Sequence, residues 1–321
     1  MKAIRVHAFG EADVLTFEDV DDPRVSEGQV LVKVEAVGIN PVETYVRAGA
    51  YALLPELPFI PGGDAAGTIA DIGAGVTGFS LGQRVYVAAP VSSGSYAQLM
   101  AVDVASVFPL HDSVSFGQGA AVGVPYATAY RALFQKAEAK AGETVFVHGA
   151  SGAVGIASVQ LAKAHGMRVV GSAGTERGKA LVESHGADCV LDHTQPDYMD
   201  ELAAFTRGAG PEVIVEMLAN VNLNRDLAAI ARFGRVIVVG NRGPTEIDAR
   251  QTMGKDSSIR GMALWNASEA ELASVHAALV AGLANGSLNP VVGREFPLAE
   301  AAAAHVAVLE PGAYGKIVLM T

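Results

Sequence analysis

The run from Val145 to Gly155 constrains the fold of this chain more than any other segment. It begins with apolar residues typical of a buried strand, passes through a glycine-rich turn, and continues into a helical pattern from Val154. Such a turn brings backbone amides to the start of the helix, and its glycines allow a ligand to approach them closely. The segment therefore predicts a turn that binds the pyrophosphate of a dinucleotide.

The glycine spacing in this turn departs from the common dinucleotide fingerprint at one position. The pattern is Ala150-x-Gly152-x-x-Gly155, so alanine stands where the first glycine is usual. A tight turn that binds nothing is the alternative. The context favours a binding turn, because a strand precedes it, a helix follows it, and a second strand, Arg168–Ala173, begins at the distance expected of a βαβ unit.

The end of that second strand indicates which dinucleotide is bound. An NAD site usually places Asp or Glu there to hold the ribose 2′-hydroxyl, but residues 171–174 are Gly, Ser, Ala and Gly. Arg177 and Lys179 follow, and positive charges beside small residues suit the 2′-phosphate of NADPH. Arg177 is the better candidate because its planar guanidinium matches a phosphate, while solvated helix charges are the alternative for both.

Composition excludes several classes of protein. The 321 residues are half hydrophobic and carry a formal net charge of −11, which argues against a surface for nucleic acid or anionic membranes. The single cysteine, Cys189, lies in a run typical of a buried strand, so no disulfide can form within the chain. No apolar run is long enough for a membrane helix, and Met1–Val6 alternates like a strand, unlike a signal peptide. We therefore expect a cytoplasmic protein.

The rhythm of the chain changes at about residue 122. Before it, short alternating runs separated by Gly and Pro predict a β-rich, barrel-like domain. After it, strand and helix patterns alternate, as in a doubly wound parallel sheet of six strands. The six predicted strands are 143–148, 168–172, 189–192, 212–217, 235–240 and 259–264.

The last part of the chain follows a complete six-strand unit. Ser268 and Glu271 have the spacing of a capping box, a second helical pattern covers 298–309, and Lys316–Met320 forms a final strand. We expect that strand to return to the first domain. The predicted architecture is α/β, with a discontinuous β-rich domain of residues 1–121 and 266–321 and a Rossmann domain of residues 122–265.

A second glycine run, Val236–Arg242, ends a predicted strand. Ligands of open α/β sheets bind beyond the carboxyl ends of the strands, so we expect Gly240, Asn241 and Arg242 to contact the cofactor. A solvated loop is the alternative for Asn241 and Arg242.

Metal chemistry is not expected. Two-domain dehydrogenases with this domain order often hold a catalytic zinc through Cys and His ligands. The segment Gly38–Tyr51 contains neither residue type, and Pro61–Gly67 lacks the His of a Gly-His-Glu run.

Six motifs, spread over the whole chain, resemble those of one family. They are Gly-Ile-Asn-Pro-Val-Glu-Thr-Tyr at 38–45, Pro-Tyr-Ala-Thr-Ala-Tyr-Arg-Ala-Leu at 125–133, Val-His-Gly-Ala-Ser-Gly-Ala-Val-Gly at 147–155, Gly-Ser-Ala-Gly-Thr-Glu at 171–176, Val-Glu-Met-Leu-Ala-Asn-Val-Asn-Leu at 215–223 and Gly-Arg-Val-Ile-Val-Val-Gly-Asn-Arg-Gly at 234–243. With them the chain resembles the zinc-free medium-chain dehydrogenase/reductases, in particular the zeta-crystallin-like quinone oxidoreductases. It departs from their pattern at Phe59, where a second tyrosine is common, and at Ala153, where Gly-Gly is usual.

The resemblance implies a GroES-like catalytic domain, a Rossmann domain and NADPH as hydride donor. The nicotinamide is expected between the domains, near Thr128 and the loop of Asn40. Taken alone, His193 would be a surface histidine and Asn222 a residue near a helix start. The resemblance implies instead that both residues contact the cofactor. The cofactor contacts that it implies are Tyr45, Ser151, Gly152, Ala153, Val154, Gly174, His193, Asn222, Val239, Gly240, Asn241, Arg242, Met262, Ala263 and Leu264.

Quinone reduction demands little from the protein, because a quinone accepts electrons readily and water can protonate the product. Asn40, Tyr45 and Tyr51 are the polar groups expected beside the acceptor. Tyr51 either donates a hydrogen bond to a developing oxyanion or only shapes the pocket. The resemblance also allows one-electron reduction, which gives semiquinones.

Two alternatives to quinone reduction stay open. One is NADPH-dependent reduction of the C=C bond of a 2-alkenal or enone. The other is a non-catalytic NADPH-binding or RNA-binding role, although the acidic balance counts against RNA. We also expect a homodimer or homotetramer, with a dimer that pairs the sixth strands near residues 259–264.

Overall fold

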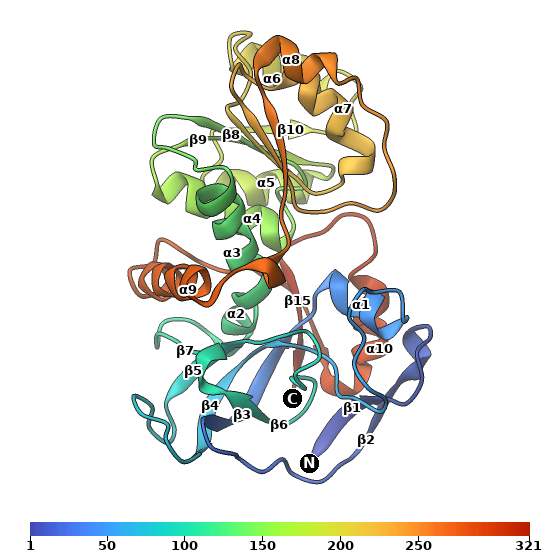
Figure 1. Cartoon of the computed structure of the whole chain (residues 1–321), viewed down its shortest axis with the longest axis vertical. Coiled ribbons are helices and arrows are strands. Elements are labelled where there is room, and N and C mark those ends of the chain that lie inside the picture. The colour runs from blue at the N-terminus through green and yellow to red at the C-terminus, as the bar shows by residue number, and fades with distance from the viewer. The chain divides into compact units, whose positions relative to one another are not determined.

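The computed structural model describes all residues, 1–321, and the chain divides into two compact units (Figure 1). Unit 1 comprises Met1–Val124, Ala278–Pro311 and Gly315–Thr321. Unit 2 comprises Pro125–Ala277 and Gly312–Tyr314.

Unit 2 contains a parallel sheet of six strands in the order β10-β9-β8-β11-β12-β13. Every neighbouring pair is parallel, as the predicted doubly wound fold requires. Strand β8 reads as an unbroken buried run because both faces of the sheet are covered. The strands are β8 (Thr144–Val147), β9 (Arg168–Ala173), β10 (Cys189–Asp192), β11 (Val213–Glu216), β12 (Arg235–Val238) and β13 (Ser258–Gly261).

Helices connect these strands and share a core with them. The core between β8, β10, β11 and two of the helices includes Phe146, Leu202 and Leu227. All six predicted strands are present, but the sixth ends at Gly261 and not near residue 264. The helices of unit 2 are α4 (Ala153–Ala164), α5 (Glu176–Ser184), α6 (Tyr198–Phe205), α7 (Ala219–Ala229) and α8 (Arg250–Lys255), and α3 (Gly123–Tyr130) leads into it.

Unit 1 is built on a largely antiparallel sheet of seven strands, in the order β14-β15-β3-β4-β5-β7 with β6 paired to β3. The final strand, β15, pairs with β3 and lies in unit 1 (Figure 1). A separate hairpin-like pair is formed by β1 and β2. The strands are β1 (Lys2–Val6), β2 (Leu15–Asp19), β3 (Gln29–Gly38), β4 (Asp64–Ile72), β5 (Arg84–Ala88), β6 (Leu99–Asp103), β7 (Val107–Pro109), β14 (Val292–Pro297) and β15 (Lys316–Met320).

Unit 1 has few helices. They are α1 (Pro41–Arg47), α2 (Phe116–Ala120), α10 (Ala301–Ala307) and the second half of α9, from Ala278 on. The predicted capping box opens α9 (Glu269–Ala284), since the Ser268 amide donates to Glu271 Oε2 at 2.8 Å and Ser268 Oγ accepts from the Glu271 amide at 3.2 Å.

The Rossmann domain was expected to end at residue 265, whereas unit 2 continues to Ala277. The start of α9 is attached to unit 2 by its own contacts. Arg131 lies 2.9 Å from the Glu271 carboxylate, and Gln135 Nε2 donates to the Glu271 carbonyl at 3.0 Å.

The prediction that Cys189 is buried is only partly right. It lies in β10 as expected, but it is half-buried because β10 is an edge strand of the sheet. Burial raises the pKa of its thiol, which keeps the residue in the unreactive form at neutral pH.

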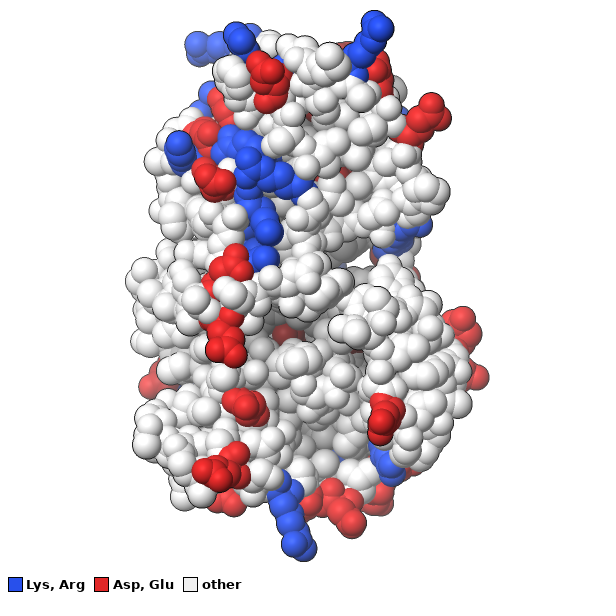
Figure 2. All heavy atoms as spheres, in the orientation of Figure 1, with Lys and Arg blue, Asp and Glu red and all other residues white.

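Charged side chains are unevenly distributed over the surface. Figure 2 shows scattered acidic groups and one streak of Lys and Arg on unit 2. Several basic side chains of this unit are paired: Arg235 lies 2.9 Å from Glu143, and Arg260 lies 3.2 Å from Glu138. None of the helices combines the length and apolar character needed to cross a membrane.

Candidate functional site

The cofactor residues predicted in unit 2 gather at one edge of its sheet, beyond the carboxyl ends of the strands. All six strands contribute because they run in the same direction. Thr128 is the exception, since it is buried on α3. Strand β8 is followed by Ser151, Gly152, Ala153 and Val154, β9 by Gly174 and Arg177, β10 by His193, β11 by Asn222, β12 by Val239, Gly240, Asn241 and Arg242, and β13 by Met262, Ala263 and Leu264.

The turn after β8 leaves the start of α4 open to an anion. Gly149 has a φ of 56°, a left-handed conformation that favours glycine. Its amide donates to Ser172 Oγ at 3.2 Å, and no side chain caps the helix at Gly152. The first-turn amides and the positive end of the helix dipole are therefore available to a pyrophosphate.

Two glycines are required at this edge because two backbone segments cross closely. A Cβ on Gly155 would lie 2.4 Å from the carbonyl oxygen of Gly149. One on Gly240 would lie 2.2 Å from the carbonyl oxygen of Met217. Only glycine fits at both positions, and the resulting backbone cradle fits a dinucleotide.

Gly174 and Thr175 directly follow β9, so no acidic side chain lies at the end of the strand, and Arg177 follows in the first turn of α5. The Arg177 guanidinium stacks on the ring of Tyr314, with its Cζ 3.8 Å from the ring centroid. Lys179 instead pairs with Glu176 at 2.5 Å and with Asp192 at 3.1 Å. The Lys179 ammonium is thus neutralised by two carboxylates, whereas the Arg177 guanidinium is held by a tyrosine ring and has no acidic partner.

The remaining predicted contacts at this edge lie nearer to the solvent. His193 is adjacent to Gly174, where a Cβ would lie 2.8 Å from its Nε2. Burial of its ring lowers the pKa of His193, so the imidazole is neutral at pH 7. Asn241 and Arg242 are exposed, and the Arg242 amide donates to Asn220 Oδ1 at 2.9 Å.

Two of the predicted acceptor residues lie at the surface of unit 1. Tyr45 is exposed on α1, and Tyr51 is half-buried in the loop that follows. Burial raises the pKa of Tyr51, so its hydroxyl remains protonated at neutral pH and can donate a hydrogen bond. The same loop exposes Leu53 and Leu54.

Asn40, the third predicted acceptor residue, lies inside a buried polar network. Its Nδ2 donates to Glu43 Oε1 at 3.1 Å and to Asp64 Oδ2 at 2.9 Å. Lys316 Nζ donates to Asn40 Oδ1 and lies 3.3 Å from Asp64 Oδ2. Glycine is required at position 38, because a Cβ there would lie 2.0 Å from the Ala120 carbonyl oxygen and 2.9 Å from Lys316 Cε. Both polar atoms of the Asn40 side chain thus have protein partners.

The network continues from Glu43 to α10. The Tyr96 hydroxyl donates to Glu43 Oε2 at 2.6 Å and lies 2.9 Å from His305 Nε2. Burial raises the pKa of Glu43 to about 7 and lowers the pKa of His305 to about 3. Burial also lowers the pKa of Lys316, while the charges of Asp64 and Glu43 act in the opposite direction.

This network does not fit a catalytic zinc. Structural and catalytic zinc sites in proteins use thiolate, imidazole and carboxylate ligands. Here the Asn40 loop offers no thiol or imidazole, and the cation beside Asp64 is the Lys316 ammonium.

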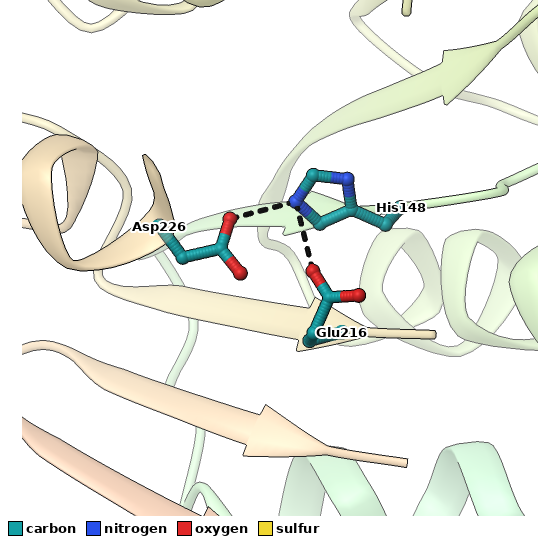
Figure 3. A group of neighbouring side chains, drawn as sticks. All are labelled: His148, Glu216 and Asp226. Carbon is teal, nitrogen blue, oxygen red and sulfur yellow. Dashed lines mark hydrogen bonds and ion pairs between the residues drawn. The ribbon is translucent and has the colours of Figure 1, made fainter. Parts of the chain in front are cut away.

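Sequence reasoning missed a second buried cluster, in unit 2. His148 follows β8, Glu216 ends β11 and Asp226 lies on α7 (Figure 3). His148 Nε2 lies 2.8 Å from Asp226 Oδ1 and 3.2 Å from Glu216 Oε2. The signal that could have revealed His148 and Glu216 is a polar residue at the end of an apolar strand run. Glu43, Asp64, Lys316 and Tyr314 were missed as well, and Lys316 begins such a run.

Comparisons with known families match both units. The family model of the alcohol dehydrogenase GroES-like domain matches residues 26–112, and that of the zinc-binding dehydrogenases matches residues 153–279.

Comparisons with individual proteins extend over the whole chain. A quinone oxidoreductase of Rattus norvegicus is 47% identical over 322 residues, covering 100% of this chain and 98% of its own. The crystal structure of Escherichia coli quinone oxidoreductase complexed with NADPH has a TM-score of 0.88 and 26% identity, with full coverage of both chains. An NAD-dependent alcohol dehydrogenase has a TM-score of 0.92 and 26% identity, also with full coverage of both chains.

Three findings agree with one another. The chain matches the GroES-like and zinc-binding dehydrogenase family models, it is 47% identical to a quinone oxidoreductase over its full length, and its Asn40 loop lacks the Cys and His ligands of a catalytic zinc. The chain therefore belongs to the zinc-free medium-chain dehydrogenase/reductases, in the group of zeta-crystallin-like quinone oxidoreductases.

Proposed function

We propose that this protein is an NADPH-dependent quinone oxidoreductase. The observation that carries the proposal is the glycine cradle at the carboxyl edge of the unit 2 sheet, with an uncapped helix start and a held arginine beside it. The full-length similarity to quinone oxidoreductases supports the substrate class. When bound, NADPH supplies the hydride, and the protein's part is to orient donor and acceptor.

The choice of NADPH over NADH depends on the corner beyond β9. The structural relatives include one complexed with NADPH and one described as NAD-dependent, so the fold alone does not select the cofactor, and this chain's own residues do. No acid lies at residues 174 and 175, directly after β9, to hold a ribose 2′-hydroxyl, and Arg177 is positioned by its stack on Tyr314. A planar guanidinium matches a phosphate by paired hydrogen bonds.

We assign the cofactor to the whole carboxyl edge of the sheet. The pyrophosphate would accept from the amides of the turn after β8, and the nicotinamide half would extend toward the loops after β12 and β13. Tyr45 and Thr128 are proposed contacts outside that edge. The residues proposed at the edge are Ser151, Gly152, Ala153, Val154, Gly174, Arg177, His193, Asn222, Val239, Gly240, Asn241, Arg242, Met262, Ala263 and Leu264.

Unit 1 is proposed to hold the acceptor. Tyr51 keeps its proton at neutral pH and can donate to an oxygen of the acceptor as negative charge develops there. Tyr45, six residues earlier on α1, is exposed and offers a second phenol. Asn40 has both polar side-chain atoms engaged, so its role would be to position α1 and the loop that carries the tyrosines.

Assembly and location are proposals of the same kind. Strand β13 is an edge strand with Ile259 at the surface, so a homodimer or homotetramer could extend the sheet across a two-fold axis. Analytical ultracentrifugation that finds only monomer would contradict this. The lone, half-buried Cys189 is compatible with the reducing cytoplasm, where we expect the protein.

The experiment that tests the function measures NADPH oxidation with an ortho-quinone, a 2-alkenal and no acceptor, each repeated with NADH. Quinone-dependent loss of NADPH with slow loss of NADH is the expected result. Turnover of the 2-alkenal alone would move the activity to C=C reduction. Binding of NADPH without turnover of either acceptor would contradict the quinone assignment. Oxygen uptake during quinone turnover would report one-electron transfer.

A further inference from the structure

The cluster of His148, Glu216 and Asp226 lies where β8 and β11 are neighbours, the point at which the strand order of the sheet reverses direction (Figure 3). All three side chains are buried, with exposed fractions of 5% or less. A single atom, His148 Nε2, contacts both carboxylates, at 2.8 Å to Asp226 and 3.2 Å to Glu216.

Glu216 connects this cluster to the turn after β11. Its Oε1 accepts hydrogen bonds from the Leu218 amide and, at 3.2 Å, from Asn222 Nδ2. Asn222 is one of the proposed cofactor contacts, and its position is therefore set by the Glu216 carboxylate. Asp226 lies four residues further along α7, on the same face as Asn222.

The backbone of Glu216 connects the cluster to the loop after β12. Its carbonyl oxygen accepts from the Val239 amide at 2.9 Å and from the Gly240 amide at 3.2 Å. The Ala219 amide returns a hydrogen bond to the Gly240 carbonyl at 3.0 Å. The loops after β11 and β12 are thus fixed against each other at the residue that carries the buried carboxylate.

His148 connects the cluster to the glycine-rich turn. Its amide donates to the Val215 carbonyl at 3.1 Å, and the next residue is Gly149, whose left-handed φ begins the turn. The imidazole between the two carboxylates therefore orients the chain as it enters the pyrophosphate cradle. Three of the loops that form the proposed cofactor site meet at these three side chains.

Burial of such a cluster is unfavourable for stability. Burial raises the pKa of both Glu216 and Asp226 to about 7 and lowers the pKa of His148, and no Lys or Arg belongs to the cluster. The other titratable groups in electrostatic reach are His193 beyond β10, and Tyr198 on α6 with its partner Arg225 on α7. Apolar side chains of similar volume would usually serve stability at least as well.

We propose that His148, Glu216 and Asp226 are positioning residues for NADPH, which hold the loops after β8, β11 and β12 in the conformation that binds the cofactor. This inference rests on the proposed function. None of the three side chains needs to touch NADPH. Their hydrogen bonds position Asn222, Gly240 and the glycine-rich turn, and these are the groups proposed to contact NADPH directly.

The test compares Glu216→Gln with Glu143→Gln. Glu143 accepts from Arg235 at 2.9 Å at the opposite, amino edge of the same sheet, so the control removes the same charge from the same unit. The dissociation constants of NADPH and NADH are measured by fluorescence titration, and the apo proteins are melted in parallel. For Glu216→Gln we expect both cofactors to bind about tenfold more weakly, a change of about 1.4 kcal/mol. For Glu143→Gln we expect a lower melting temperature and unchanged binding.

Turnover gives a second readout. At saturating NADPH, Glu216→Gln should retain kcat within about twofold while KM for NADPH rises, since uniform binding is lost and the chemical step is not. The Asp226 side chain contacts neither the loop after β11 nor the loop after β12. Asp226→Asn is therefore the variant whose NADPH affinity is measured if Glu216→Gln does not fold. A tenfold weakening in either variant with Glu143→Gln unchanged supports the proposal.

Each contrary outcome has its own signature. Binding by Glu216→Gln and Asp226→Asn that equals wild type would reduce the cluster to a structural role and overturn the proposal. One equivalent of a divalent metal in wild type, absent from Glu216→Gln, would also overturn it and make the cluster a metal site. Wild type that binds no NADPH would instead overturn the proposed function, and the positioning role with it.

Discussion

Each of the two units buries a polar network, and the two networks balance charge in different ways. In unit 1, the Lys316 ammonium lies between Asn40 and the Asp64 carboxylate, so this network contains a cation that pairs with one of its carboxylates. In unit 2, His148, Glu216 and Asp226 include no Lys or Arg, and they can become neutral as a group only by sharing protons.

This difference teaches what each network can do. The hydrogen-bonded ion pair of Lys316 and Asp64 holds Asn40, and with it the start of α1, against the sheet of unit 1. A proton-sharing cluster fixes geometry only while its protons are distributed correctly. Burial raises the pKa of Glu43 in the unit 1 network to about 7, but that network also holds a lysine. The cluster beside the proposed cofactor loops has two such carboxyl groups, Glu216 and Asp226, and no Lys or Arg.

The largest expected effect comes from removing the buried cation of unit 1, Lys316. Lys316→Met leaves the Asp64 carboxylate buried without its ion pair, which should lower the free energy of unfolding by about 3–5 kcal/mol. Urea denaturation, followed by fluorescence and circular dichroism, measures this loss. Adding Asp64→Asn should restore part of the stability, because the uncompensated charge is then removed.

The matched control for this lysine is Lys33→Met. Lys33 pairs with Glu35 at 2.9 Å on the surface, with 63% of its side chain exposed. Exposed pairs of this kind contribute about 0–1 kcal/mol. Equal losses for Lys316→Met and Lys33→Met would show that the buried network does not depend on its cation and would remove the contrast between the two units.

A smaller effect separates direct contact with the cofactor from positioning. Arg177→Ala should weaken NADPH binding by about 10–100-fold, since hydrogen bonds to a charged group contribute about 1.5–3 kcal/mol. Binding of NADH, which has no 2′-phosphate, should change little. This contrasts with Glu216→Gln, for which both cofactors should lose affinity equally, and fluorescence titration distinguishes the two patterns.

Lys179→Ala is the control for Arg177→Ala, because Lys179 already pairs with Glu176 and Asp192. We expect it to leave the ratio of NADPH to NADH affinity unchanged. A loss of selectivity in Lys179→Ala but not in Arg177→Ala would place the 2′-phosphate away from the Arg177–Tyr314 stack.

The sequence was sufficient to predict the parts of the fold that depend on local patterns. Buried parallel strands are continuous apolar runs, and the turn from β8 to α4 needs glycine where backbone segments cross, as at Gly155. The proposed cofactor residues lie at one edge because parallel strands bring their ends together, but of these His193, Asn222 and 262–264 were expected only from the family resemblance.

Neither buried network could be predicted in this way. Lys316 and Asn40 are 276 positions apart, and His148 and Asp226 are 78 positions apart, so no local pattern joins them. Asn40 shows the consequence: its chemistry suggested contact with the acceptor, but its neighbours in the fold engage the side chain on both polar atoms. Burial also decides the protonation of Glu43 and Glu216, and burial follows from packing that residue types alone do not specify.

The smallest expected effect tests the proton-sharing cluster through pH. Glu216 and Asp226 have pKa values raised to about 7 by burial, so the folded protein keeps protons that the unfolded chain releases above about pH 4. Stability from these protons is full below pH 4 and is lost as the pH rises through 7. Asp226→Asn removes one such group and should reduce the loss between pH 4.5 and 7.5 by about 1–2 kcal/mol. Urea titrations at each pH measure it, with the exposed Glu246→Gln as the control. A pH profile identical to that of wild type would mean that the cluster does not exchange protons in this range. It would contradict the view that the unit 2 cluster balances its charge by sharing protons.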